Sequence, residues 1–297
     1  MSGDLPTPVE VRLIDAHVEL RNQVWGEANL AFSHAVLTQV SLPFRNPKES
    51  RTFSRKCGAA SIQMEAGYLP DQEGNFVPVG LPFGPRARLV LIHLCSEALR
   101  QRSPIVELEG GSFTQFVHEL GISINGQNFQ SLKEQIKRMS VVSLRLARSR
   151  QRAVEVYQGR LFRSLRAEWS VTPRQRLLWP SHVEFSPDFY ESLAVQAVPL
   201  RREAIGALKH SARALDVYCW LSHRLWRVKK NTRISYRALQ YQFGNPEGNQ
   251  RSFQRAFDKA LNQALVVYPE AKVASVDGGI VLKPSRPAVP FKQPKLL

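Results

Sequence analysis

A helix predicted from about Gln250 to Leu265 carries cationic and amide side chains on one face. Its apolar residues recur at i, i+3, i+4, i+7, i+8 and i+11, which places them on one face. An arginine can donate two hydrogen bonds to guanine, and an asparagine can donate one to adenine and accept one from it. We therefore expect DNA contacts from the opposite face, although that face would also suit simple solvation. The expected contacts are Arg251, Ser252, Arg255, Lys259 and Asn262.

A second predicted helix, from about Gln127 to Met139, has a polar face rich in amides, and here an ordinary solvated face is a stronger alternative. Each helix is followed by a basic hairpin that would meet phosphates, which gives affinity and salt dependence rather than sequence choice. The contacts expected on the helix are Gln127, Gln130, Ser131, Lys137 and Arg138. Those expected on the hairpins are Arg148, Arg150 and Arg152 in the first, and Lys272 and Lys283 in the second.

Signals for catalysis, a cofactor or a metal are scarce. The sequence has no phosphate-binding G-x-x-x-x-G-K-[ST] loop and no two-histidine metal motif of a nicking enzyme. Cys219 and His223 lie four residues apart, but Zn²⁺ prefers about four ligands and no Cys-x-x-Cys is present. We therefore expect no enzymatic activity, no cofactor and no metal. A nuclease is the alternative, and it would need clustered carboxylates where the basic segments offer only scattered ones.

The charge of the 297-residue chain, net +16, is concentrated in two segments. Residues 1–131 have a net charge of −2, 132–178 of +9, 179–200 of −3 and 201–297 of +12. This distribution favours two basic modules joined by an acidic linker, and a polyanion as the partner. A generally cationic protein is the alternative.

Two stretches share one order of elements: helix, short strand, helix, helix, basic hairpin. In the second stretch a helix from about Arg202 to Arg227 is followed by a strand at Thr232–Ile234, a helix capped by Ser235, the 250–265 helix and a hairpin turning at Asp277-Gly278-Gly279. In the first, a helix from Arg86 precedes a strand at 105–108, a short helix from Ser112 to Gly121, the 127–139 helix and the strand VVSLRLA. This order is typical of a winged helix, whose third helix enters the DNA major groove.

The predicted fold is α+β, with two tandem winged-helix domains and an N-terminal extension of helices and a hairpin. The extension packs on the first domain and includes a hairpin that turns at DQEGN. The predicted boundaries are 1–82 for the extension, 83–178 for the first winged helix, 179–200 for the linker, 201–287 for the second, DNA-binding winged helix, and 288–297 for a flexible tail.

The uncharged run from Ala28 to Phe44 predicts a buried helix rather than a membrane span, because polar residues interrupt it. The three cysteines are too few for a disulfide framework, and the first residues lack an apolar leader. The bacterial cytoplasm is the expected compartment. Tyr218, Trp220 and Trp226 could stack on bases, but their spacing favours the core.

Several ordered blocks resemble the plasmid-encoded RepA replication initiators. They begin with LPFGPRARLVLIHLCSEALRQRSPIVELEGGSFTQFVHELG and continue with ALDVYCWLSHRL, TRISYRALQYQFG and FDKALNQALVVYPEAKV. The likeness runs from about Leu30 to Pro287. It implies two winged helices, as the order of elements also does, and it carries over no catalytic residue.

The resemblance implies a protein that binds direct repeats (iterons) at a plasmid origin, helps to open it and recruits a host helicase or its loader. It also implies that a homodimer represses its own gene while the monomer initiates. Two winged helices on one side of the duplex predict a site of roughly 20 bp. The alternative is a winged-helix transcriptional regulator or autorepressor without initiator activity. We expect the dimer surface in the near-neutral N-terminal region with the first winged helix.

Overall fold

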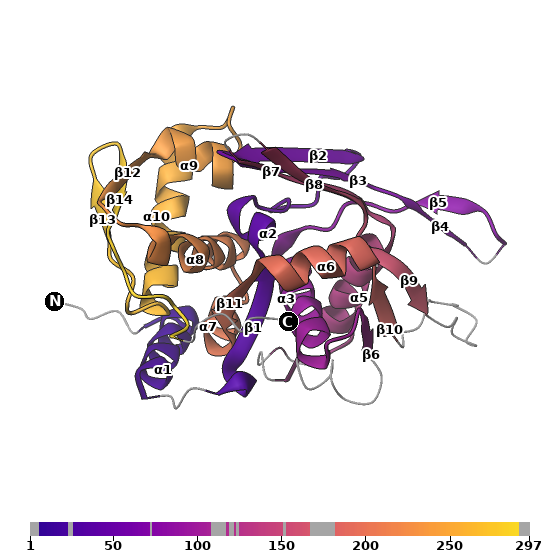
Figure 1. Ribbon diagram of the computed structural model, residues 1–297, viewed down its shortest axis with the longest axis horizontal. Helices are drawn as coiled ribbons and strands as arrows, with labels where there is room; N and C mark the ends of the chain where they lie inside the picture. Colours follow the sequence, from indigo (N-terminus) through magenta and orange to yellow (C-terminus); the bar gives the residue numbers. More distant parts are fainter. Residues whose placement is uncertain are drawn as a thin grey trace.

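The computed structural model of the chain describes residues 6–22, 26–71, 73–107, 117–118, 122, 125–150, 153–166 and 182–290 (Figure 1). Within these ranges helices pack around five small antiparallel sheets. This arrangement confirms the α+β class. No helix in the described ranges is long and apolar enough to cross a membrane.

The C-terminal elements follow the predicted order. The Ser235 side chain accepts a hydrogen bond from the backbone N–H of Ala238 and so caps α9. Gly278 adopts a φ of +70° in the hairpin turn, a conformation that glycine takes without strain. In the sheet, β14 lies between β12 and β13. The elements are α8 (Ala212–Arg224), β12 (Thr232–Ser235), α9 (Tyr236–Phe243), α10 (Gln250–Val266), β13 (Val273–Val276) and β14 (Gly279–Leu282).

The helix expected from Arg202 to Arg227 is broken. It forms α7 (Arg202–Leu208), α8 and the short 3-10 helix η2 (Leu225–Arg227). The break occurs because Ser211 begins a new helix, its side chain accepting from the N–H of Ala214 at 3.2 Å.

The N-terminal counterpart has the same strand order, but from other strands than expected. β10 lies between β6 and β9, as β14 lies between β12 and β13. The predicted short helix from Ser112 to Gly121 lies outside the described residues, apart from Val117 and His118. The described elements are α3 (Gly84–Gln101), β6 (Ile105–Glu107), α5 (Gly126–Val141), β9 (Phe162–Arg166) and β10 (His182–Phe185).

The segment 179–200, expected as a linker, contributes to this sheet instead. Its described residues form β10, α6 (Pro187–Gln196) and all but the last residue of β11 (Ala197–Arg201). Val183, Phe185, Phe189 and Leu193 are buried, so these residues are held by the core rather than exposed to solvent. The other expected domain boundaries stay predictions.

The expected basic hairpin of the first unit belongs to a separate four-stranded sheet in the order β2-β3-β7-β8 (Figure 1). Beyond one end of this sheet, β4 and β5 form the hairpin predicted at the DQEGN turn. These strands are β2 (Thr52–Cys57), β3 (Ala60–Glu65), β4 (Tyr68–Pro70), β5 (Phe76–Pro78), β7 (Ser143–Arg150) and β8 (Ala153–Arg160).

The run from Ala28 to Phe44 is not one buried helix. Its described elements are the end of the 3-10 helix η1 (Glu27–Asn29), strand β1 (Leu30–His34) and the short α2 (Ala35–Gln39). β1 pairs with β11, which lies far away in sequence. An apolar run alone does not distinguish a buried helix from a buried strand, and this distant partner decides the outcome. The N-terminal helix α1 (Pro8–Asn22) packs on α7 and α10.

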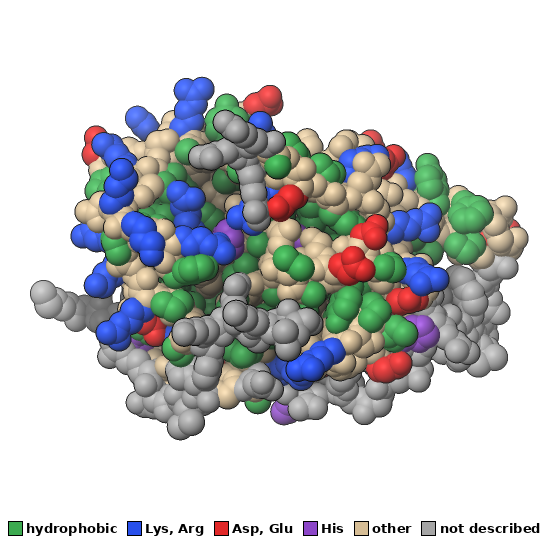
Figure 2. Space-filling model, in the orientation of Figure 1, with side chains coloured by type: hydrophobic (Ala, Val, Ile, Leu, Met, Phe, Trp, Pro, Cys, Tyr) green, Lys and Arg blue, Asp and Glu red, His purple; other side chains and the backbone are tan. Residues whose placement is uncertain are grey.

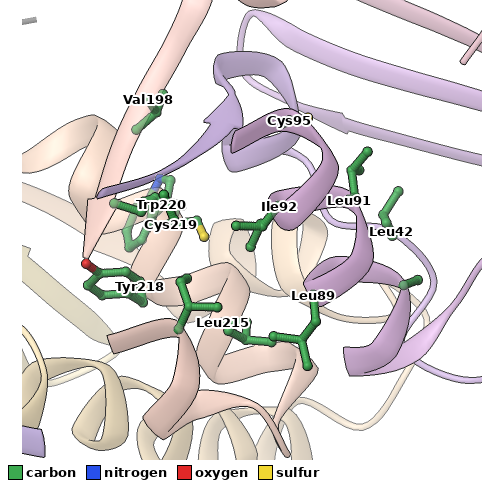
Figure 3. Packing of buried hydrophobic residues seen from close by; sticks show 14 of the residues in the cluster. Leu42, Leu89, Leu91, Ile92, Cys95, Val198, Leu215, Tyr218, Cys219 and Trp220 are labelled. Atoms are coloured by element: carbon green, nitrogen blue, oxygen red, sulfur yellow. The ribbon is translucent and has the colours of Figure 1, made fainter. Parts of the chain in front are cut away.

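The core is continuous through the molecule, with α3 and α8 at its centre. Figure 3 shows Leu89, Ile92 and Cys95 of α3 near Leu215 and Cys219 of α8. The C-terminal segment is not wholly flexible, since Ala288 and Val289 are buried. The Tyr268 hydroxyl donates to the carbonyl oxygen of Arg286 at 2.8 Å. Residues 291–297 lie outside the described ranges.

Candidate nucleic-acid interface

Helix α10 presents all five expected contacts to solvent. The Asn249 side chain caps the helix by accepting from the N–H of Ser252 at 2.9 Å. Phe253, Phe257 and Leu261 are buried on the opposite face, and the Phe253 and Phe257 rings stack with centroids 5.6 Å apart. The exposed residues are Arg251, Ser252, Arg255, Lys259 and Asn262.

Asp258 is an acidic side chain of α10 that is bonded to α9. Its Oδ1 accepts a hydrogen bond of 2.8 Å from the Tyr236 hydroxyl on α9. Burial, followed by this bond to the carboxylate, raises the pKa of Tyr236 to about 12, so the hydroxyl remains a donor at neutral pH. The carboxylate therefore braces α10 against α9.

Helix α1 lies beside the C-terminal half of α10. One nitrogen of His17, Nδ1, is 2.7 Å from the carbonyl oxygen of Val266. The pKa of Glu10 is lowered chiefly by hydrogen bonds from Thr7, and the charge of Lys259 lowers it further. The most open part of the candidate interface is therefore the N-terminal half, with Arg251, Ser252 and Arg255.

Further cations surround α10. Lys272 and Lys283 are exposed where the β13–β14 hairpin begins and ends, and the N–H of Lys283 donates to the carbonyl oxygen of Lys272 at 2.9 Å. Arg233 on β12 and Arg237 on α9 are also exposed, and the sequence reasoning missed them. The sequence could have revealed them, because Arg233 and Arg237 lie just before and just after the predicted helix cap Ser235. Figure 2 shows Lys and Arg side chains gathered over this C-terminal part of the molecule.

The contacts expected on α5 are not equally available. Gln127 and Gln130 are exposed, whereas Ser131 and Lys137 are half-buried. Arg138 is occupied, because its guanidinium donates to Glu134 Oε1 and to the Leu81 carbonyl oxygen, both at 2.9 Å.

Arg148 does not lie at the tip of the β7–β8 hairpin. It faces Glu155 across the two strands and lines a cavity of about 710 Å³ together with His34. Its charge lowers the pKa of His34, although burial is the larger cause. The side chain of Arg150 and the whole of Arg152 lie outside the described residues. Most of the predicted DNA contacts that are exposed to solvent lie on α5 and α10.

The sequence raised two further interpretations, metal ligation and base stacking by aromatic side chains. The described part of the chain contains no group of three or more His, Cys, Asp or Glu side chains that could hold a metal ion. Tyr218 and Trp220 are buried, as the core interpretation predicts, whereas Trp226 is exposed. The Tyr218 hydroxyl accepts from the backbone N–H of Arg201 at 2.9 Å.

Comparisons with known proteins identify a family and a fold. The family described as plasmid encoded RepA protein matches residues 81–241. A structure of domains 2 and 3 of RctB, determined on selenomethionine derivatives, has a TM-score of 0.53 and 10% identity, and the match covers 83% of this chain and 95% of that one. A second structure of RctB domains 2–3 has a TM-score of 0.51 and 12% identity, with coverage of 84% and 96%. At these identities the likeness establishes the fold alone. No curated protein sequence matches the chain.

Proposed function

Since the chain belongs to the family of plasmid-encoded RepA proteins, we propose that it is a plasmid replication initiator that binds direct repeats at an origin. In this role it opens the origin and recruits a host helicase or its loader in the bacterial cytoplasm. The monomer initiates, and a homodimer represses the gene. We assign it no catalytic step, no metal and no cofactor.

Both repeated units act as winged helices in this proposal. The topology supports this assignment. In the sheets β6-β10-β9 and β12-β14-β13 the last strand in sequence lies between the other two, and a helix precedes the first strand of each. In both units the last helix before the hairpin is amphipathic and presents polar side chains to solvent. The β7–β8 hairpin is then an insertion between the third helix and the wing of the first unit.

Helix α10 enters the major groove, and α5 enters the next one. Arg255 donates two hydrogen bonds to guanine, and Asn262 donates one to adenine and accepts one from it, while Lys272 and Lys283 meet phosphates beside the groove. Two units about one helical turn apart give a site of roughly 20 bp. The exposure of all five expected contacts on one face of α10 carries the proposal.

The test uses duplexes made from the DNA that flanks the gene, with scrambled duplexes of the same composition. Footprinting of the purified chain is expected to protect direct repeats. Arg255→Ala should weaken the specific complex by about 1–3 kcal/mol. Lys48→Gln, an exposed cation in the loop before β2, serves as the matched control. Equal affinity for flanking and scrambled DNA at two salt concentrations contradicts the proposal.

The second candidate is a transcriptional regulator or autorepressor with the same DNA contacts. The gene with its flanks, placed in a plasmid that cannot replicate, separates the two functions, because only an initiator restores replication. Mg²⁺-dependent cleavage of DNA, lost on substitution of an Asp or Glu, would instead indicate a nuclease.

A further inference from the structure

The β4–β5 hairpin projects from the rest of the molecule and exposes an apolar face (Figure 1). Tyr68 pairs with Pro78 and Pro70 pairs with Phe76, and cross-strand partners share a face. All four residues are exposed, Phe76 to 72% and Tyr68 to 52%. Hydrophobic side chains are visible at this end in Figure 2. An exposed apolar face on a projecting arm is a feature of contact sites rather than of an ordinary surface.

The hairpin is held in one shape before any partner binds. At its tip, Asp71 Oδ1 accepts from the backbone N–H groups of Glu73 and Asn75, each at 2.9 Å. At its base, the Arg51 guanidinium lies 4.3 Å from the Tyr68 ring centroid. Such preorganisation reduces the entropy lost on binding. Pro70 and Pro78 have no N–H to offer a new strand, so docking uses the side chains of the face rather than strand addition.

A groove of about 930 Å³ lies between the four-stranded sheet and the turn from α9 to α10. Val156 and Tyr241 are exposed to 59% and 48% and supply apolar surface. Three of the described residues that line the groove are cations and none is an acid. The cations are Arg55, Lys56 and Arg145.

The hairpin and the groove are complementary in charge, and the hairpin lies beyond the end of the strands β2 and β3, whose residues line the groove. Residues 68–78 include Asp71 and Glu73 and no Lys or Arg. Strand β3 passes from Gln63 at the groove to Glu65 and the chain then enters β4 at Tyr68, a path of roughly 16 Å at about 3.3 Å per residue. Figure 1 shows β4 and β5 pointing away from α9. A hairpin therefore reaches the groove of a second copy, not its own.

We propose that the β4–β5 hairpin of one copy docks its Tyr68, Pro70, Phe76 and Pro78 face in the groove of a second copy. The two contact surfaces are different, so the association is head-to-tail and repeats in one direction. Successive copies on direct repeats have such an arrangement, whereas a two-fold dimer does not. This use on DNA rests on the proposed function, but the contact itself does not.

Cysteine cross-linking without DNA tests the contact directly. In the full chain with Cys57→Ser, one preparation carries Val77→Cys, on the other face of the hairpin, and the other Ser54→Cys, which lines the groove. A short bismaleimide is expected to join the two in a mixture at least tenfold faster than it joins either preparation to Val195→Cys, a control exposed to 83% on α6. Rates equal to the control overturn the proposal, as does preferential joining of two Val77→Cys copies.

Charge reversal at Lys56 and Glu73 is a second test of the contact between groove and hairpin. Lys56→Glu in the groove-cysteine copy is expected to lower the cross-linking rate at least tenfold, and Glu73→Lys in the hairpin-cysteine copy is expected to restore it. Both side chains are exposed, so folding is preserved. Absence of rescue overturns the assigned pairing. A chain that fails to bind DNA yet cross-links as expected refutes the proposed function and leaves the contact intact.

Discussion

Arg88 on α3 and Asp216 on α8 form a two-point ion pair in the interior, between the two repeated units. The Arg88 Nε is 2.6 Å from Oδ1 of Asp216, and Nη2 is 2.7 Å from Oδ2. The side chains are exposed to only 5% and 11%. Arg88 also donates to the carbonyl oxygens of Leu42 and Gly84, each at 2.8 Å. One guanidinium therefore ties α3, α8 and the loop after α2 together.

Removing the Asp216 carboxylate should be strongly destabilising, because it leaves the Arg88 guanidinium buried without a counter-charge. We expect Asp216→Ala to lower the free energy of unfolding by about 3–5 kcal/mol. Arg163→Ala provides the comparison, since its ion pair with Glu184 leaves the two side chains 66% and 22% exposed and contributes under about 1 kcal/mol. Urea unfolding of both variants measures the difference. Similar losses in the two variants would contradict a structural role for the buried pair.

The sequence predicted the C-terminal unit almost completely, because its strands pair within one short stretch and its helices have caps and clear apolar stripes. It failed where the pairing partner is distant. Apolar and polar residues alternate along β7 and β8, and this pattern is compatible with any neighbouring strand. The partner of β6 is β10, which follows residues 167–181. Local periodicity identifies a strand, but it does not identify the strand beside it.

The same limit applies to the candidate site. On α10 the helical pattern correctly predicts which side chains face solvent, because no described segment covers the N-terminal half of the helix. On α5 the helical angle of Arg138 was also outward, but the loop at Gly80 and Leu81 packs over it. A contact from a loop 57 residues away leaves no trace in the helical pattern.

The segment after β14 should contribute to stability up to Val289. The Arg201 side chain, exposed to 1%, donates to the carbonyl oxygen of Ala288, and Nη2 lies 2.5 Å from Glu270 Oε1. A chain ending at Lys283 loses the bonds at Arg286 and Ala288, at about 1–3 kcal/mol for each buried group left unpaired. A chain ending at Pro290 keeps them. Thermal unfolding should separate the two truncations, and equal midpoints would refute this assignment.

Stability should fall on mild acidification, with His34 as one cause. Burial, and secondarily Arg148, lowers the pKa of His34 to about 4, below the value near 6.5 expected in the unfolded chain. The unfolded state therefore binds the proton first, so this contribution is complete above pH 6.5 and is lost as the pH falls toward 4.

The variant His34→Asn tests this pH dependence. In the native protein, His34 Nδ1 accepts from the N–H of Val36, which requires an unprotonated nitrogen, and Nε2 is 2.9 Å from Ser192 Oγ. His34→Asn retains a capping acceptor but does not titrate. It should reduce the slope of unfolding free energy against pH between 6.5 and 4, by up to about 1.4 kcal/mol per pH unit. An unchanged slope in urea titrations would exclude His34 as a contributor.

Arg138 and Gln130 on α5 should separate stability from DNA binding. The Arg138 guanidinium lies 5.0 Å from the Phe83 ring centroid and close to Gly80, in addition to its bonds to Glu134 and Leu81. We expect Arg138→Ala to destabilise the fold by about 1–3 kcal/mol, since it leaves a carbonyl oxygen and a carboxylate without their donor.

Gln130→Ala should have the opposite profile. Its side chain is exposed, so unfolding should change by less than about 0.5 kcal/mol, whereas specific DNA affinity should fall. The salt dependence of binding adds a further distinction, because loss of a phosphate contact lowers the slope of log K against log salt by about 1. An Arg138 variant that stays fully stable but loses one unit of that slope would return Arg138 to the DNA interface, and would mean that the loop over α5 moves aside when DNA binds.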